Sequence, residues 1–327
     1  MKKFVQQALV ASLSSLALGL SAQAADWPEP GHTVEVILPI GGGTGTGDAL
    51  GRIVADGLEK QLNIKAVPLN KPGANGIIGA TEASKAKADG YHLLFSWAGT
   101  LAVNPSMFKK LSYDPVKDFE VIGLVAEVPN ILVINKDLPI HSVDDLVKYA
   151  KEHPNELNAG STGIGSSMHL AAELFQNETG TKLEHVPYNS PAEGTTDMIG
   201  GDIQMMFQLV PGIRAMVEAD RVRALAIMSE QRSPVLPDVP TMAEQGYPSL
   251  LSSTWFALLA PTGTPDAVLD KLNEGLNGLL KDEAVLEKLN SLGASPLGGT
   301  REQGNKHLVD ETAKWAEVIE KAGIQKQ

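Results

Sequence analysis

Short apolar runs alternate with stretches of helical periodicity along the first hundred residues. Three runs are typical of buried strands: TVEVILPI (33–40), KAVPLN (65–70) and HLLFSW (92–97). Apolar residues also recur at helical spacing after the first run, to about Leu62: Leu50, Ile53, Val54 and Leu58. This strand–helix–strand order predicts a parallel, doubly wound sheet with right-handed crossovers.

A second α/β series follows. Residues 121–135 predict two apolar strands separated by Val128-Pro129, and further strands are expected over 157–160, 182–188, 202–211, 222–229 and 254–261. Helices are expected after Ser142, within 157–175, over 192–201 and over 265–281, the last capped by Thr264. Thr300 with Gln303 predicts a capping box for a final helix.

The first residues have the composition of an export signal. Lys2 and Lys3 precede the largely apolar stretch 4–20, and Ala22-Gln23-Ala24 has the form of a cleavage site. No later stretch reaches the roughly 18 apolar residues of a membrane span. The chain has no cysteine, which excludes thiol nucleophiles, thiolate metal sites and an acylated lipoprotein terminus. We expect a signal peptide over residues 1–24 and a periplasmic protein.

Composition and charge narrow the possible ligands. The 327 residues suffice for two domains, and 43% of them are hydrophobic. The net charge of −12 argues against nucleic acid, which requires a basic surface. The same charge does not attract anions over distance, so an anion site would have to be built locally.

The stretch PIGGGTGTGDALGR (39–52) is a glycine-rich turn before a helix. It does not fit G-x-G-x-x-G, because Thr46, Asp48 or Leu50 stands at the place of the last glycine. It does not fit the P-loop, because Asp48 stands where the P-loop has lysine. Free N–H groups at a helix N-terminus still favour a compact anion. A purely structural turn, with Asp48 capping the helix, is the alternative. The candidate ligand-binding residues here are Gly41, Gly42, Gly43, Thr44, Thr46 and Asp48.

Other polar loops lie where predicted strands end, which is where ligands bind in open α/β sheets. STGIGSSM (161–168) lacks the G-x-S-x-G nucleophile elbow, and His169 is expected to be structural. The histidines show no metal spacing, so we expect no catalytic residue, metal or cofactor. Trp97 and Tyr188 are equally consistent with burial. The further candidates are Trp97, Thr100, Asn104, Ser161, Gly163, Ser166, Ser167 and Tyr188.

Across its whole length after the signal, the chain resembles the periplasmic substrate-binding proteins of tripartite tricarboxylate transporters, the Bug family. The resemblance rests on motifs in the same order: PIGGGTGTGDALGR, NKPGANGIIGA, ADGYHLLFSWAGTLAVNP, LSYDPVKDFEVIGLVAEVPNILVIN, GIGSSMHLAAELF, HVPYNSPAEGTTDMIGGDIQMMF, RSPVLPDVPTMAEQGYP and WFALLAPTGTP. It implies an α/β fold of the two-domain type II periplasmic binding class, with a ligand cleft between the domains. It also implies a small carboxylate ligand, held by loop backbone groups and water.

The sequence departs from the family pattern in three places. Ile40 replaces the usual Phe, the first loop is one residue longer, and Gln208 stands where Asp is usual. We add Gln208 to the candidate ligand-binding residues, because its neutral amide would permit a second carboxylate and disfavour an amine.

Together these points predict a periplasmic receptor that closes two domains around a di-/tricarboxylate or an aromatic acid. Domain 1 is expected over 25–126 plus 253–327 and domain 2 over 127–252. The expected partners are the carboxylate and the membrane permease subunits of a tripartite transporter, with no nucleic acid, and the protein is expected to be a monomer. A sensor protein that presents its ligand to a receptor kinase remains an alternative, and a periplasmic hydrolase is a weaker one.

Overall fold

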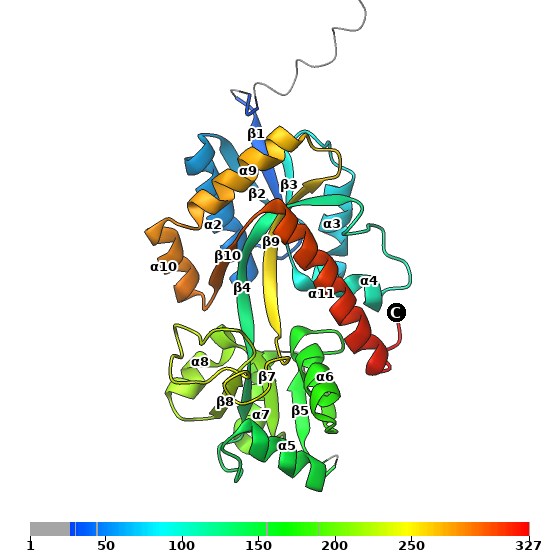
Figure 1. Cartoon of the computed structure of the whole chain (residues 1–327), viewed down its shortest axis with the longest axis vertical. Helices are drawn as coiled ribbons and strands as arrows, with labels where there is room; N and C mark the ends of the chain where they lie inside the picture. Colours follow the sequence, from blue (N-terminus) through cyan, green and yellow to red (C-terminus); the bar gives the residue numbers. More distant parts are fainter. Residues whose placement is uncertain (1–26, 30, 44, 155, 189, 327) are drawn as a thin grey trace, which may run out of the picture.

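The computed structural model describes residues 27–29, 31–43, 45–154, 156–188 and 190–326. The predicted signal segment 1–24 and the candidate Thr44 lie outside the described residues. Two lobes lie at opposite ends of the molecule, and two long strands run between them (Figure 1). The strand order is β2-β1-β3-β9-β4-β7-β5-β6, and β10 and β8 also pair with β4.

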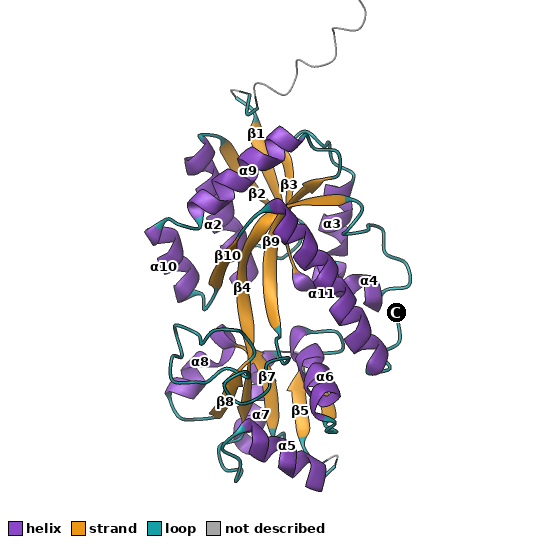
Figure 2. Ribbon diagram, in the orientation of Figure 1, coloured by secondary structure: helices purple, strands orange, loops and turns teal. Residues whose placement is uncertain are grey.

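The first lobe is built on a mixed sheet. Strands β1 (Thr33–Leu38), β2 (Lys65–Asn70) and β3 (His92–Trp97) are parallel, as their apolar sequences predict. Helices cover both faces of this sheet (Figure 2). The helices of this lobe are α2 (Gly45–Leu62), η1 (Ala74–Gly76), α3 (Ile77–Ser84), the short π-helix η2 (Gly99–Val103), α4 (Asn104–Met107), α9 (Asp266–Leu279), α10 (Glu283–Ser291) and α11 (Arg301–Lys321). The lobe also contains the short strand β10 (Ser295–Gly298).

The second lobe repeats the α/β pattern. Its strands β5 and β7 are parallel, β5 and β6 are parallel, and β7 and β8 run antiparallel to β4. Its elements are α5 (Val143–Glu152), β5 (Asn158–Ser161), α6 (Ser167–Thr179), β6 (Glu184–Pro187), α7 (Pro191–Gly200), β7 (Met205–Leu209), α8 (Val210–Glu218) and β8 (Arg223–Ile227).

The lobes are joined by β4 (Phe119–Ile134) and β9 (Ser253–Pro261). The prediction of two strands separated at Pro129 is wrong, because β4 is continuous through it. Pro129 is the last β4 residue paired with β9, and Asn130 is the first paired with β7. The proline therefore lies where the strand passes from one sheet to the other, and its missing N–H interrupts neither ladder.

Two further local predictions are corrected. The strand predicted over 202–211 ends at Leu209, and α8 begins at Val210 with a proline in its first turn. Thr264 does not cap α9, because its hydroxyl donates to the Pro261 carbonyl and Pro265 is the N-cap residue. The capping box of Thr300 and Gln303 on α11 is confirmed, as is the Ser142 cap on α5.

The buried core is divided along with the lobes. One cluster lies between α2, α9 and the first sheet, and includes Leu50, Leu58 and Leu272. A second lies inside the other lobe around Ile131 and Met206. A third runs through both lobes and joins α6 to α11. Over the residues that the structure describes, every helix is too short or too polar to cross a bilayer.

Candidate functional site

A cavity of 300 Å³ lies where the two lobes meet. Residues of the first lobe, the second lobe and the connecting strand β9 all line it: Ile40, Gly47, Asn75, Trp97, Ala98, Gly99, Val103, Gly165, Ser166, Ser167, Leu170, Leu209, Ser253, Thr254, Phe256 and Trp315. Side chains alternate across β9. Thr254 and Phe256 face this cavity, whereas Trp255 lines a second cavity of 430 Å³ behind the strand.

The first lobe supplies most of the apolar wall. A Cβ on Gly99 would lie 2.5 Å from Trp97 Nε1, so the Trp97 indole lies directly on the backbone at residue 99. Phe256 stacks on Phe95 with ring centroids 5.6 Å apart, which fixes its ring at the cavity wall. A Cβ on Gly47 would meet both Ile40 and Phe256, at 3.1 and 3.2 Å. Glycine at this position lets the first turn of α2 approach the cavity.

The second lobe supplies the polar wall, at the N-terminus of α6. Ser166 is the N-cap residue, and its hydroxyl oxygen accepts the His169 N–H at 3.2 Å. The first turn of α6 contains no acidic residue, so its positive end is available to an anion. Gly165 has φ +81°, and a Cβ there would lie 2.8 Å from Met107 Cε. The loop before α6 therefore contacts the first lobe across the cavity.

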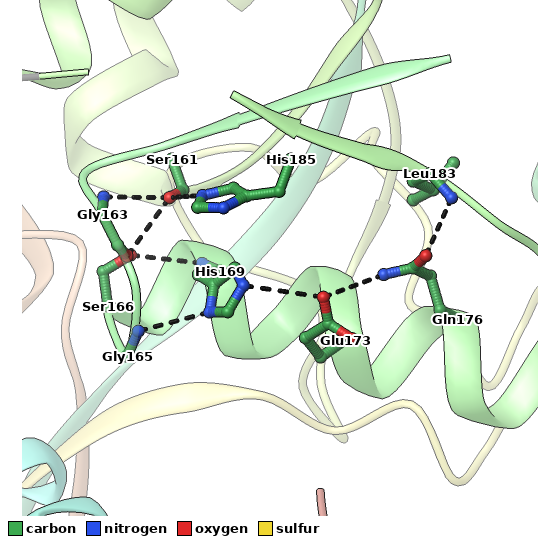
Figure 3. Close-up of polar contacts among 9 residues, drawn as sticks. All are labelled: Ser161, Gly163, Gly165, Ser166, His169, Glu173, Gln176, Leu183 and His185. Carbon is green, nitrogen blue, oxygen red and sulfur yellow. Dashed lines mark hydrogen bonds and ion pairs between the residues drawn. The ribbon is translucent and has the colours of Figure 1, made fainter. Parts of the chain in front are cut away.

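His169 and His185 hold the loop that precedes α6 (Figure 3). Gly165 N–H donates to His169 Nδ1 at 3.2 Å, and His169 Nε2 lies 3.6 Å from Glu173 Oε1. The His169 and His185 ring centroids are 4.2 Å apart. Since Nδ1 accepts a hydrogen bond, the neutral His169 ring carries its proton on Nε2. Burial and the neighbouring His185 lower the pKa of His169 to about 4.

A serine–histidine pair is present in the same cluster. Ser161 Oγ and His185 Nε2 are 2.6 Å apart, and Ser161 Oγ also accepts the Gly163 N–H (Figure 3). Ser161 is only 1% exposed, and neither residue of the pair lines the cavity. In this position the pair holds the 161–165 turn, and it does not meet the geometric requirement of a nucleophile facing substrate.

The glycine-rich loop is tied to α2 through Asp48. Asp48, which is 3% exposed, accepts hydrogen bonds from Gly43 N–H at 2.8 Å, Arg52 Nε at 2.9 Å and Asn70 Nδ2 at 2.8 Å. The Arg52 guanidinium is the main cause of the lowered pKa of Asp48. The candidates Gly41, Gly42, Gly43, Thr46 and Asp48 do not line the cavity, whereas Gly47 and Ile40 from the same stretch do.

The remaining candidates differ in their relation to the cavity. Trp97, Ser166 and Ser167 line the cavity. Thr100 and Asn104 are fully buried, and both donate to the Asn75 carbonyl at 3.1 Å, so they support a cavity residue from behind. Gly163 does not line the cavity, although its N–H holds the turn through Ser161.

Tyr188 and Gln208 also lie outside the lining. Tyr188 donates its hydroxyl to Asp197 at 2.9 Å, and burial raises the pKa of Tyr188 to about 12. Gln208 is fully buried and donates to Thr195. Its Oε1 has no partner within the described part of the chain.

Sequence reasoning missed several lining residues. Asn75 has φ +51° in the turn before α3, and Leu209 ends β7. Phe256 comes from the connecting strand and Trp315 from the final helix. The motifs NKPGANGIIGA and WFALLAPTGTP contain Asn75 and Phe256. Which side chains of a motif face the cavity depends on strand register and packing.

The chain matches the family model "Tripartite tricarboxylate transporter family receptor" over residues 50–324. The chain belongs to this family. It is 35% identical to Protein BugT of Bordetella pertussis over 306 residues, covering 93% of this chain and 94% of that protein.

Solved structures agree with this assignment. The structure of R. palustris Rpa4515 with adipate has 35% sequence identity to this chain and a TM-score of 0.75. The match covers 92% of this chain and 100% of that one. The structure of periplasmic binding protein BugD is 33% identical, has a TM-score of 0.71 and covers 91% of this chain and 100% of that one. The expected two-domain type II periplasmic binding fold is therefore confirmed, and the family consists of binding proteins.

Proposed function

We propose that this family member is a periplasmic receptor that captures a small carboxylate between its two lobes. The observation that carries the proposal is the cavity itself, because both lobes and β9 contribute to its wall. Relatives whose structures carry adipate and malate are 35% and 29% identical to this chain. The α6 N-terminus, with its Ser166 and Ser167 hydroxyls, offers a neutral site for the carboxylate.

The proposed cycle is opening and closure about β4 and β9. We place the domain boundaries near residues 126 and 252, within β4 and just before β9. A ligand that contacts both lobes binds the closed state more tightly and shifts the population toward it. Export by the segment 1–24 would bring the monomeric receptor to the periplasm, where its closed form would meet the permease of a tripartite transporter. Binding without turnover is favoured over hydrolysis, because neither Ser161 nor His185 lines the cavity.

Thermal denaturation against a panel of carboxylic acids tests the proposal. A ligand at 100 times its Kd should stabilise the protein by about 2.7 kcal/mol. Ser167→Trp should abolish this shift by filling the cavity. Ser291→Trp makes the same change at an exposed position on α10 and should leave the shift intact. The proposal is wrong if no acid in the panel shifts the thermal transition of the unmodified protein. It is also wrong if the unmodified protein hydrolyses an ester at this cavity.

A further inference from the structure

We infer that the cavity selects an acid with one carboxylate and a flat apolar body, that is, an aromatic monocarboxylate. The inference rests on the proposed function, since it names the class of acid that the same cavity takes. It runs against the expectation drawn from Gln208, which favoured a second carboxylate.

The cavity lining is rich in aromatic and aliphatic side chains. Three aromatic side chains come to it from separate elements, Trp97 from β3, Phe256 from β9 and Trp315 from α11. Aliphatic side chains fill much of the remaining wall: Ile40, Val103, Leu170 and Leu209. Aromatic walls favour flat apolar ligands through stacked and edge-to-face contacts. A hydroxylated acid would place its polar groups against these side chains without partners.

The cavity wall offers no counter-charge for a second carboxylate among the described residues. In the described part of the chain, every residue lining this cavity is uncharged. Arg52 on α2 and Lys314 beside Trp315 are each bound elsewhere. Arg52 is bound to Asp48 and Asn70, and Lys314 donates to Glu311 and to the Leu251 carbonyl and lines the other cavity. Each carboxylate beyond the first would therefore lose water without gaining a counter-charge.

Two helix N-termini reach the cavity, and they differ in charge. Gly47 brings the first turn of α2 to the wall, and Ser166 and Ser167 bring that of α6. The positive end of α2 is already compensated by the buried Asp48 carboxylate, which lies in its first turn. The first turn of α6 has no acidic residue. The cavity thus has one long helix end that is open to an anion and one whose positive end already has a carboxylate partner.

Calorimetric titration of the intact mature protein tests the inference. The panel consists of benzoate, 2-naphthoate, adipate, malate and citrate at one pH and one ionic strength. We expect the tighter aromatic monocarboxylate to bind at least about tenfold more tightly than adipate, and citrate to bind most weakly. A di- or tricarboxylate that binds more tightly than both aromatic acids overturns the inference and leaves the proposed function standing. If none of the five acids binds, both fail.

A matched pair of variants separates wall chemistry from folding. Leu209→Asn places an amide of similar size at the half-buried cavity wall, and we expect aromatic affinity to fall about tenfold. The affinity for adipate should change much less. Leu297→Asn makes the same exchange at a residue 38% exposed on β10 and should change neither affinity. If Leu209→Asn, with its unfolding transition retained, leaves aromatic binding unchanged, the wall does not select the ligand. Trp97→Leu gives a second reading at a half-buried position and should likewise reduce only aromatic binding.

Discussion

Trp315 donates its indole N–H to the Glu311 carboxylate, 2.9 Å away on the same helix. The same carboxylate oxygen accepts the Trp255 indole at 3.0 Å. The other oxygen accepts Lys314 Nζ at 2.9 Å, and Lys314 also donates to the Leu251 carbonyl just before β9. Glu311 therefore links a wall of the cavity between the lobes to the strand that joins them.

Replacing Glu311 with alanine should both destabilise the protein and weaken ligand binding. Burial raises the pKa of Glu311, but Lys314 and the indole donor outweigh it, so the pKa lies below its usual value and the group stays charged. Loss of this acceptor leaves two indoles without their partner, at about 1–3 kcal/mol for each buried group. Urea unfolding should show a loss of this order. Asp310→Ala, one residue away and exposed, should cost under about 0.5 kcal/mol. Equal losses in the two variants would contradict the prediction.

Replacing Gly165 with alanine should lower ligand affinity by separating the lobes. The added Cβ would lie 2.8 Å from Met107 Cε, and the backbone is at φ +81°. Gly163→Ala is the matched control, since Gly163 also has a positive φ, +107°, but a Cβ there meets nothing within 4 Å. Both variants should lose about 1 kcal/mol of stability through backbone strain.

Only Gly165→Ala should raise the Kd, and adding Met107→Ala should restore part of the affinity. Calorimetric titration of the three variants decides. If Gly163→Ala weakens binding as much as Gly165→Ala, strain in the loop explains the loss and contact between the lobes does not.

Acidification below pH 6.5 should reduce stability through His169. The pKa of His169 is lowered from 6.5 to about 4, so the unfolded chain takes up a proton at a higher pH than the folded protein does. The stability that depends on neutral His169 is present above about pH 6.5 and is lost as the pH falls toward 4. Protonation would also place an Nδ1–H against the Gly165 N–H donor.

Urea unfolding at pH 7 and pH 5 measures this loss. His169→Gln should reduce the difference in unfolding free energy between the two pH values. His185, whose pKa burial also lowers, should account for part of what remains. Burial raises the pKa of Glu173, so the stability that this group contributes is lost as the pH rises. Its effect on the pH dependence is therefore opposite to that of His169. An unchanged pH dependence in His169→Gln would exclude His169 as the titrating group.

Much of the fold was predictable because its strands are apolar runs with polar ends. Residues 65–70 and 92–97 form strands with those bounds, and the capping box of Thr300 and Gln303 lies where the sequence places it. The division at Pro129 was wrong because proline normally ends pairing. Here the strand changes partner at that residue, a fact of tertiary structure that local sequence does not contain.

The candidate site was predictable only in part. Trp97 at the end of β3, and Ser166 and Ser167 at the start of α6, reach the cavity, as expected for residues that follow strand ends. Whether a polar side chain points into the cavity or into its own lobe was not predictable from the sequence. Asp48 and Tyr188 bond within their own lobes, and Trp315 reaches the cavity from the last helix of the chain. Long-range packing of this kind leaves no local signature.

Replacing Asp48 with asparagine should shift selectivity toward dicarboxylates. The change removes the negative charge from the first turn of α2 while keeping a side chain of similar size. An anion near a helix N-terminus gains about 0.3–1 kcal/mol, so the affinity for adipate relative to benzoate should rise roughly two- to fivefold. Asp56→Asn removes the same charge from the exposed face of α2 and should leave the ratio unchanged. Stability should fall in Asp48→Asn alone, because Arg52 and Gly43 N–H both lose a charged acceptor. Calorimetric titration of both acids with both variants measures the ratio. A ratio that moves equally in the two variants would indicate that overall charge governs selectivity and that the N-terminus of α2 has no specific part in it.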